Sequence, residues 1–133
     1  MDKNKLETTN LDVLIVGAGF AGMYILHKLR KLKLNVLVLE KASDVGGTWY
    51  WNRYPGARCD IESLEYSYSF SEDLQQEWDW SHRYSDQSEI LKYANYVAEK
   101  FNLKNNIKFN TEVKSASYKK NLKKWKIITT SGK

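Results

Sequence analysis

An α/β fold with a parallel sheet is predicted by three features near the start of this 133-residue sequence. An apolar run at 11–16 leads directly into a glycine-rich turn at 17–22. An amphipathic pattern at about 21–33 predicts a helix, and a second apolar run follows at 35–40. Strand, helix and strand thus fall within about thirty residues, which is typical of a right-handed βαβ unit in a Rossmann-like fold.

The glycine-rich turn has the spacing of a phosphate-binding turn. Gly17 allows the chain to turn sharply out of the strand, and Gly19 allows the backbone to approach a pyrophosphate. Gly22 allows the helix to pack on the strand, and the helix N-terminus offers N–H groups to an anion. Glycine turns are also common as purely structural turns, so this spacing alone leaves both interpretations open.

Glu40 ends the second apolar run, roughly twenty positions beyond the glycine turn. A carboxylate at this place can accept hydrogen bonds from a ribose diol, and it would repel a 2′-phosphate. The turn is therefore expected to hold the adenosine half of FAD or NAD rather than NADP. The alternative is an ordinary exposed glutamate at the end of a strand.

Composition favours one globular domain, or part of one, without a nucleic-acid or membrane partner. The hydrophobic fraction is 42%. The net charge of +5 comes mostly from scattered lysines, with denser groups at 28–33 and 119–126, and these are expected to form a solvated basic surface. Residues 1–10 are polar and predict a short flexible leader, and no apolar run is long enough to span a bilayer. With the single cysteine Cys59, these features predict a cytoplasmic location.

No metal site is expected, because neither His27 nor His82 belongs to an array of ligands at metal-binding spacing. A different functional segment is expected at 46–60, which reads GGTWYWNRYPGARCD. It is dense in aromatic and arginine side chains where a nicotinamide-binding domain would enter its next helix. The segment is therefore expected to be a long irregular loop with a functional role.

Four stretches of the sequence together resemble the N-terminal part of Baeyer–Villiger monooxygenases, in particular the phenylacetone monooxygenase type. They are the turn at 17–22, the pair at 40–41, the segment at 46–60 and the run YSYSF at 66–70. The resemblance extends from about residue 11 to the end of the chain. The segment at 46–60 is far more specific for this family than the glycine turn.

The resemblance implies a function and its cofactors. In this family NADPH reduces FAD, and a C4a-peroxyflavin inserts one oxygen atom from O2 next to a ketone carbonyl to give an ester or lactone. The substrates would be O2 and a small-molecule ketone. Residues 11–133 would be the N-terminal part of a FAD-binding domain that is incomplete at its C-terminus and inactive alone, with a missing C-terminal polypeptide as a possible partner.

The resemblance also implies individual roles. Glu40 would hold the adenosine ribose with Lys41 near the adenine, and Val113 would contact the adenine through its backbone. Asp60 would be catalytic by pairing with an arginine outside this sequence, although it could instead only stabilise its loop. The implied cofactor-binding residues, with Arg58, Cys59 and Asp60 also beside NADP, are Gly17, Gly19, Phe20, Ala21, Gly22, Glu40, Lys41, Thr48, Trp49, Trp51, Arg58, Cys59, Asp60, Tyr66 and Val113.

The second half of the chain predicts further elements of the same domain. A helix is expected at about 87–101, a strand at 107–109, and an antiparallel hairpin from 112–118 and 125–130, as part of a β-meander. Residues 71–83 are expected to form surface structure. Two alternatives remain open: an N- or S-oxygenating flavin monooxygenase of the same class, and a FAD-binding module without catalytic activity.

Overall fold

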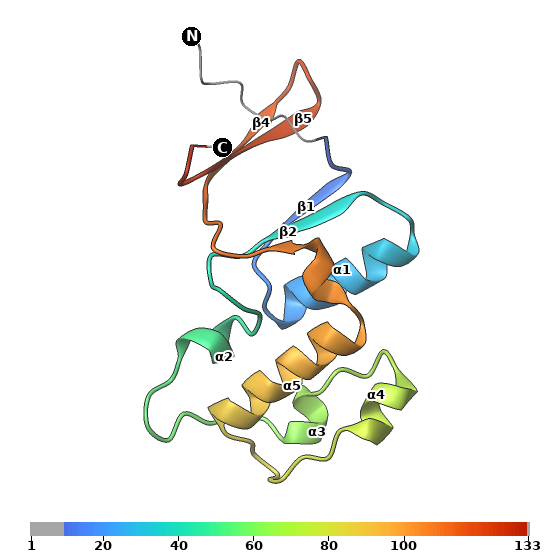
Figure 1. Cartoon of the computed structure of the whole chain (residues 1–133), viewed down its shortest axis with the longest axis vertical. Coiled ribbons are helices and arrows are strands. Elements are labelled where there is room, and N and C mark those ends of the chain that lie inside the picture. The colour runs from blue at the N-terminus through green and yellow to red at the C-terminus, as the bar shows by residue number, and fades with distance from the viewer. Residues whose placement is uncertain (1–9, 133) are drawn as a thin grey trace.

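A three-stranded parallel sheet forms the centre of the computed structural model, which describes residues 10–132 (Figure 1). Its strands are β1 (Val13–Val16), β2 (Val36–Leu39) and β3 (Ile107–Lys108), in the order β1-β2-β3. Val13 is paired with Val36, and Val38 with Ile107. The predicted parallel sheet is confirmed. Nearly all of the predicted leader at 1–10 lies outside the described residues.

The crossover between β1 and β2 is the helix α1 (Phe20–Lys31), close to the predicted range. Leu32 is its C-cap, and Lys33 has a positive φ of 58°, so the helix ends two residues earlier than the pattern indicated. Met23 and Leu26 are buried on its inner face, whereas Lys28 and Lys31 are exposed. The amphipathic spacing therefore places α1 against the sheet, as a βαβ unit requires.

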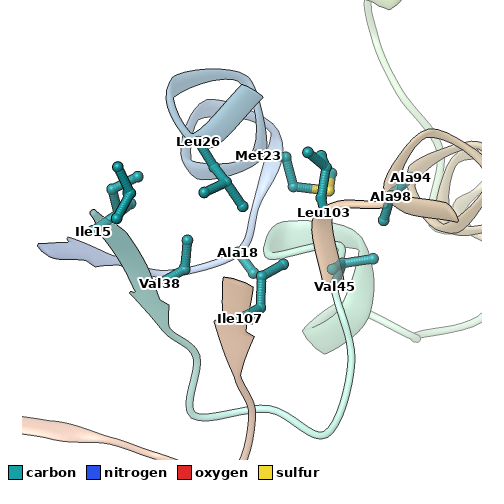
Figure 2. Close-up of a cluster of buried hydrophobic side chains, with 11 residues drawn as sticks. Ile15, Ala18, Met23, Leu26, Val38, Val45, Ala94, Ala98, Leu103 and Ile107 are labelled. Carbon is teal, nitrogen blue, oxygen red and sulfur yellow. The ribbon is translucent and has the colours of Figure 1, made fainter. Parts of the chain in front are cut away.

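The main core lies between α1 and the sheet and continues to the C-terminal end of α5 (Gln87–Lys100). Figure 2 shows Leu26 of α1 and Val38 of β2 pointing toward each other, with Ala94 and Ala98 of α5 at the other end of the cluster. The 3-10 turn η1 (Leu103–Asn106) contributes the buried Leu103. Residues far apart in the sequence thus share one apolar core.

One short helix interrupts the segment at 46–60 that was expected to be an irregular loop, and a second helix follows this segment. They are α2 (Thr48–Trp51) and α3 (Ser63–Tyr66). The N-cap of α2 is Gly47, which has a positive φ of 55°. The prediction of an irregular course was therefore wrong at Thr48–Trp51, because the positive φ of Gly47 allows the chain to turn directly into a helix.

Residues 71–83 are not only surface structure, so this prediction was wrong in part. They contain α4 (Glu72–Glu77), whose Leu74 is fully buried. Beyond α4, the rings of Trp78 and Trp80 lie 5.2 Å and 4.9 Å from the ring of Tyr93 on α5. Aromatic side chains at these distances gain from packing, so the segment forms a second core with α5.

The antiparallel hairpin is confirmed as β4 (Val113–Lys119) and β5 (Lys124–Thr129). It forms its own two-stranded sheet and projects from the end of the parallel sheet that lies away from α4 and α5 (Figure 1). The third strand of the predicted meander does not occur among the described residues. Between residues 10 and 132, no helix is both long and apolar enough to cross a membrane.

Gly22→Ala is expected to lower the free energy of unfolding by at least about 2 kcal/mol, because overpacking a tight backbone contact forces the main chain to shift. A Cβ at this position would lie 2.0 Å from the carbonyl oxygen of Gly17. Urea unfolding followed by circular dichroism measures the change.

Gly19→Ala is the matched control, since its Cβ would meet Gly47 Cα at an ordinary 3.5 Å. Its cost is expected to stay below about 1 kcal/mol, the effect of replacing a glycine N-cap with alanine. Equal losses of unfolding free energy in the two variants would contradict the close packing of α1 on the glycine turn.

Candidate dinucleotide site

A cleft of about 400 Å³ lies at the C-terminal end of β1, where parallel α/β sheets bind ligands. It is bounded by the glycine turn, the start of α1, the Gly46–Gly47 pair and the first residues of α2. Its lining residues are Val16, Gly17, Gly19, Phe20, Ala21, Gly22, Gly46, Gly47, Thr48, Trp49 and Tyr66. Eight of the residues predicted from the sequence to bind a cofactor are therefore brought together in one cleft.

The N-terminus of α1 opens into this cleft without a side-chain cap. Its N-cap is Gly19, and its first turn contains no acidic residue. The short helices α2 and α3 also lack a side-chain cap, whereas Ser71 caps α4 and Asp86 caps α5 through their side-chain oxygens. An uncapped helix start leaves N–H groups and a partial positive charge available to an anion.

The glycine turn is in direct backbone contact with the second glycine pair. Gly46 donates a backbone hydrogen bond of 3.1 Å to the carbonyl oxygen of Ala18. A Cβ on Gly47 would lie 2.9 Å from Gly19 Cα, and Gly47 also has a positive φ. A side chain on Gly47 would separate the two loops, which explains why glycine is needed at this position.

Glu40 is buried, with 5% of its surface exposed, and it binds two backbone amides. One carboxylate oxygen accepts a hydrogen bond of 2.6 Å from the N–H of Ala18, and the other accepts one of 2.7 Å from the N–H of Ala42. This burial excludes the alternative of an ordinary exposed glutamate at the end of a strand. Glu40 ties the glycine turn to the segment that follows β2, a role that its position in the sequence did not reveal.

Aromatic side chains form one wall of the cleft. The indole N–H of Trp49 donates to the hydroxyl of Tyr66 at 2.9 Å, and the ring of Phe20 lies 5.3 Å from that of Tyr66. The hydroxyl of Tyr68 donates to the carbonyl oxygen of Phe20 at 2.5 Å, and burial raises the pKa of Tyr68. Tyr68 was missed as a site residue, although it lies within the YSYSF run.

The segment at 57–60 is fixed to the N-terminal end of α5 and lies outside the lining of the cleft. Cys59 is buried and donates its N–H to Ser85 at 3.0 Å, while the Arg58 guanidinium donates to the carbonyl oxygen of Tyr84. Cys59 packs with Trp49 and Ile90, so the segment supports the aromatic wall from behind. Asp60 is exposed.

Lys41, Trp51 and Val113 lie on the Glu40 side of the site. The Lys41 ammonium is 5.0 Å from the centre of the exposed Trp51 ring, within cation–π range. The N–H of Thr111 donates to the carbonyl oxygen of Glu40 at 2.9 Å, which ties the approach to β4 to the end of β2. Val113, the first residue of β4, is half-buried two positions beyond this bond.

The described residues contain no group of three or more histidine, cysteine, aspartate or glutamate side chains arranged to hold a metal ion. The ring of His27 lies 4.5 Å from that of Phe70 and 4.8 Å from that of Phe101. Burial lowers the pKa of His27, and the nearby cations of α1 lower it further. These contacts favour a neutral packing residue at this position.

A parallel sheet that leads through a glycine turn into an uncapped helix defines a dinucleotide-binding domain of the Rossmann class. The chain belongs to the family described as NAD(P)-binding Rossmann-like domains, whose family model matches residues 15–96. This match covers the glycine turn, Glu40 and the aromatic wall.

The resemblance to Baeyer–Villiger monooxygenases is confirmed by two curated relatives, and a relative named as an N-monooxygenase is about as similar. Acetone monooxygenase (methyl acetate-forming) of Gordonia sp. (strain TY-5) is 47% identical over 96% of this chain. A Baeyer–Villiger monooxygenase of Pseudooceanicola batsensis is 46% identical over 98% of it, and phenazine N-monooxygenase of Lysobacter antibioticus is 46% identical over 95%. The chain spans 24% of each relative, about a quarter of its length.

A solved structure supports the same relationship. Oxidized steroid monooxygenase bound to NADP is 52% identical to this chain and superimposes with a TM-score of 0.91. The similarity covers 94% of this chain and 24% of that protein. The arrangement of β1, α1 and the following segments is therefore the one found in flavin monooxygenases.

Glu40→Gln is expected to lower the free energy of unfolding by about 1–3 kcal/mol, since an amide offers only one acceptor oxygen and leaves one buried N–H without a partner. Urea unfolding measures the loss. Glu112→Gln is the control, because its side chain is exposed. A stability of Glu40→Gln equal to that of the control would contradict the tethering role.

The stability of the site is expected to depend on pH through Asp86. Its carboxylate accepts the N–H of Glu89 at 2.9 Å and the hydroxyl of Ser88 at 2.8 Å, and these bonds, with a smaller effect of Arg58, lower the pKa of Asp86 below its ordinary value of 3.8. A lowered pKa in the folded state stabilises the protein above the unfolded pKa, and this stabilisation is lost as the pH falls through the folded pKa.

Asp86→Asn keeps an N-cap acceptor but cannot titrate, so urea midpoints measured between about pH 5 and pH 3 should fall less steeply than in the wild type. Asp86→Ala should show the same flattening and lose about 1 kcal/mol at neutral pH. If the urea midpoint of both variants fell with pH as steeply as that of the wild type, Asp86 would be excluded as the titrating group.

Proposed function

We propose that this chain binds FAD in the cleft at the end of β1 and supplies the FAD-binding part of a Baeyer–Villiger-type monooxygenase that uses NADPH. The observation that carries the proposal is the uncapped start of α1 beside two glycine turns in backbone contact. This arrangement fits a pyrophosphate, because it offers N–H groups at a place where no side chain blocks the approach.

Glu40 fits a second role as the ribose ligand. Its two oxygens each accept one backbone N–H, and each carboxylate oxygen has a further lone pair. Glu40 can therefore hold the turn in place and accept hydrogen bonds from the adenosine diol together. Lys41 and the backbone of Val113 lie on this side and are assigned to the adenine.

The flavin half is assigned to the aromatic wall. Thr48, Trp49 and Tyr66 line the cleft beyond the pyrophosphate position, and the exposed Trp51 is placed at the edge of the site. The hydrogen bond between Trp49 and Tyr66 fixes the orientation of both rings, so they can pack against a planar ligand and exclude water.

The segment with Arg58, Cys59 and Asp60 is assigned to the side that faces NADP. Asp60 is proposed as the catalytic carboxylate, since an exposed acid on a loop that is anchored to α5 can pair with an arginine from outside this chain. Bound FAD would supply the redox chemistry by which NADPH and O2 convert a ketone to an ester or lactone.

The parallel sheet and the cleft support the assignment of residues 11–133 to one part of a larger FAD-binding domain. Because the relatives are about four times as long as this chain, a further polypeptide region is proposed to complete the active site. A cytoplasmic location is proposed from the sequence alone. A second candidate function is that of an N-oxygenating enzyme. This chain is almost equally similar to phenazine N-monooxygenase and to acetone monooxygenase.

FAD binding by the purified chain tests the proposal. We expect the wild type to retain FAD after refolding with the cofactor, detected by its visible spectrum, and to quench flavin fluorescence through Trp49 and Tyr66. Gly19→Ala should fold but bind FAD at least about tenfold more weakly, since its methyl group occupies the pyrophosphate approach.

Gly56→Ala is the control for an added methyl group away from the cleft: a Cβ there meets nothing within 4 Å, and its positive φ of 81° lowers the folding stability without changing the cleft. It should bind FAD like the wild type. A folded wild-type chain that retains no flavin would rule out FAD binding by this chain alone. Equal FAD affinities of Gly19→Ala and the wild type would contradict the assignment of the pyrophosphate to the glycine turn.

A further inference from the structure

Two buried serine side chains lie outside the lining of the cleft but close to its aromatic wall. Ser63 begins α3 and is 4% exposed, and Ser85 precedes the N-cap of α5 and is 1% exposed. Their hydroxyl oxygens lie 2.7 Å apart. Burying a hydroxyl group costs free energy unless it is hydrogen-bonded, so the partners of this pair indicate its role.

The Ser63 hydroxyl joins α3 to the segment at 82–85 through backbone groups. Its oxygen accepts the N–H of Ser85 at 3.1 Å, and its hydrogen can donate to the carbonyl oxygen of His82 at 2.8 Å or to that of Arg83 at 3.1 Å. The backbone N–H of Ser63 also donates to Arg83 at 2.7 Å. One small side chain therefore binds both a donor and an acceptor of a segment that is distant in the sequence.

These bonds fix both ends of the loop that carries Asp60. Before the loop, the N–H of Cys59 donates to the carbonyl oxygen of Ser85 at 3.0 Å. After the loop, Ser63 is held by the same segment at 82–85. Only residues 60–62 lie between the two anchors, so the position of the Asp60 backbone is restricted by that segment.

The same serine supports the aromatic wall. Ser63 begins α3 and Tyr66 ends it. The carbonyl oxygen of Ser63 accepts the hydroxyl of Ser67 at 2.7 Å, and the Ser67 oxygen accepts the indole N–H of Trp80 at 2.7 Å. A single helical turn is not stable by itself, so the orientation of Tyr66 toward Trp49 depends on these tertiary bonds.

We propose that the Ser63 hydroxyl is a positioning group for the flavin half of the site: it holds Tyr66 against the flavin and Asp60 on the side that faces NADP. The inference rests on the proposed function for its ligand, whereas the bonds that carry it are internal to the chain. Groups that act on a ligand need supporting hydrogen bonds that fix their own positions. Without the hydroxyl, the buried N–H of Ser85 would lose its acceptor and α3 its side-chain link to 82–85.

Hydrogen exchange and flavin fluorescence of the full chain test this proposal. In Ser63→Ala, the backbone amides of Cys59 and Tyr66 should exchange about tenfold faster than in the wild type, the size expected from losing one buried hydrogen bond. At saturating FAD, the bound flavin should fluoresce more strongly than in the wild type, because the Tyr66 ring is no longer held against it.

Three further variants separate positioning from a general loss of stability. Ser85→Ala is the matched control, because it removes the other hydroxyl of the pair but leaves the Ser63 hydroxyl bound to backbone groups, and both readouts should stay close to the wild type. Ser63→Thr keeps the hydroxyl and should restore both readouts. In a Tyr66→Leu background, Ser63→Ala should not change the flavin fluorescence further, since the ring on which it acts is absent.

Three results would overturn the proposal. One is wild-type exchange at the Cys59 and Tyr66 amides in Ser63→Ala. Another is an equal change in Ser63→Ala and Ser85→Ala, which would assign the effect to the loss of any buried hydroxyl. The third is the same rise in flavin fluorescence with and without the Tyr66 ring.

Two further outcomes also have a definite meaning. If the wild type retains no FAD, the proposed function fails, while the exchange rates still decide whether Ser63 fixes α3 and the loop. If far-UV circular dichroism shows that Ser63→Ala is unfolded, exchange in the wild type decides instead. Amides of Cys59 and Tyr66 that exchange as fast as that of the exposed Asp60 would then overturn the proposal, and slow exchange at both would support it.

Discussion

The contact between two glycine turns is the constraint on which the rest of the site depends. Gly47 approaches Gly19 so closely that a Cβ on Gly47 would lie 2.9 Å from Gly19 Cα, and the carbonyl oxygen of Ala18 accepts the N–H of Gly46. Glu40 holds the same turn from the other side through the N–H of Ala18. The start of α1 is therefore fixed before any ligand arrives, and an anion can bind without reorganising the backbone.

Aromatic packing connects the glycine turn and the start of α1 to the remainder of the domain. Phe20, in the first turn of α1, contacts Tyr66 and Tyr68, and the Tyr68 hydroxyl binds its carbonyl oxygen. Tyr68 is itself held by Tyr93 of α5, whose hydroxyl accepts its N–H. The segment at 66–80 and α5 thus form a rigid support for the cleft, which explains why a segment predicted to be superficial is partly core.

The two ends of the molecule have different physical characters. The end with α5 is a packed aromatic core with little net charge exposed at the cleft, and it suits a site that must exclude water. The hairpin end is basic, amphipathic and open to solvent. No residue of the cleft lining belongs to β4 or β5, and Val113 at the start of β4 is the one position of the hairpin that is assigned to the cofactor.

The sequence by itself determined the elements whose cause is local: the glycine turn, the amphipathic α1, the apolar β1 and β2, and the paired hairpin. Backbone freedom at glycine and hydrophobic periodicity act over a few residues, so they can be recognised without coordinates. Only the tertiary structure decided that Glu40 binds backbone amides and that Gly47 meets Gly19. These features join residues more than twenty positions apart, and their cause is packing, which no local pattern encodes.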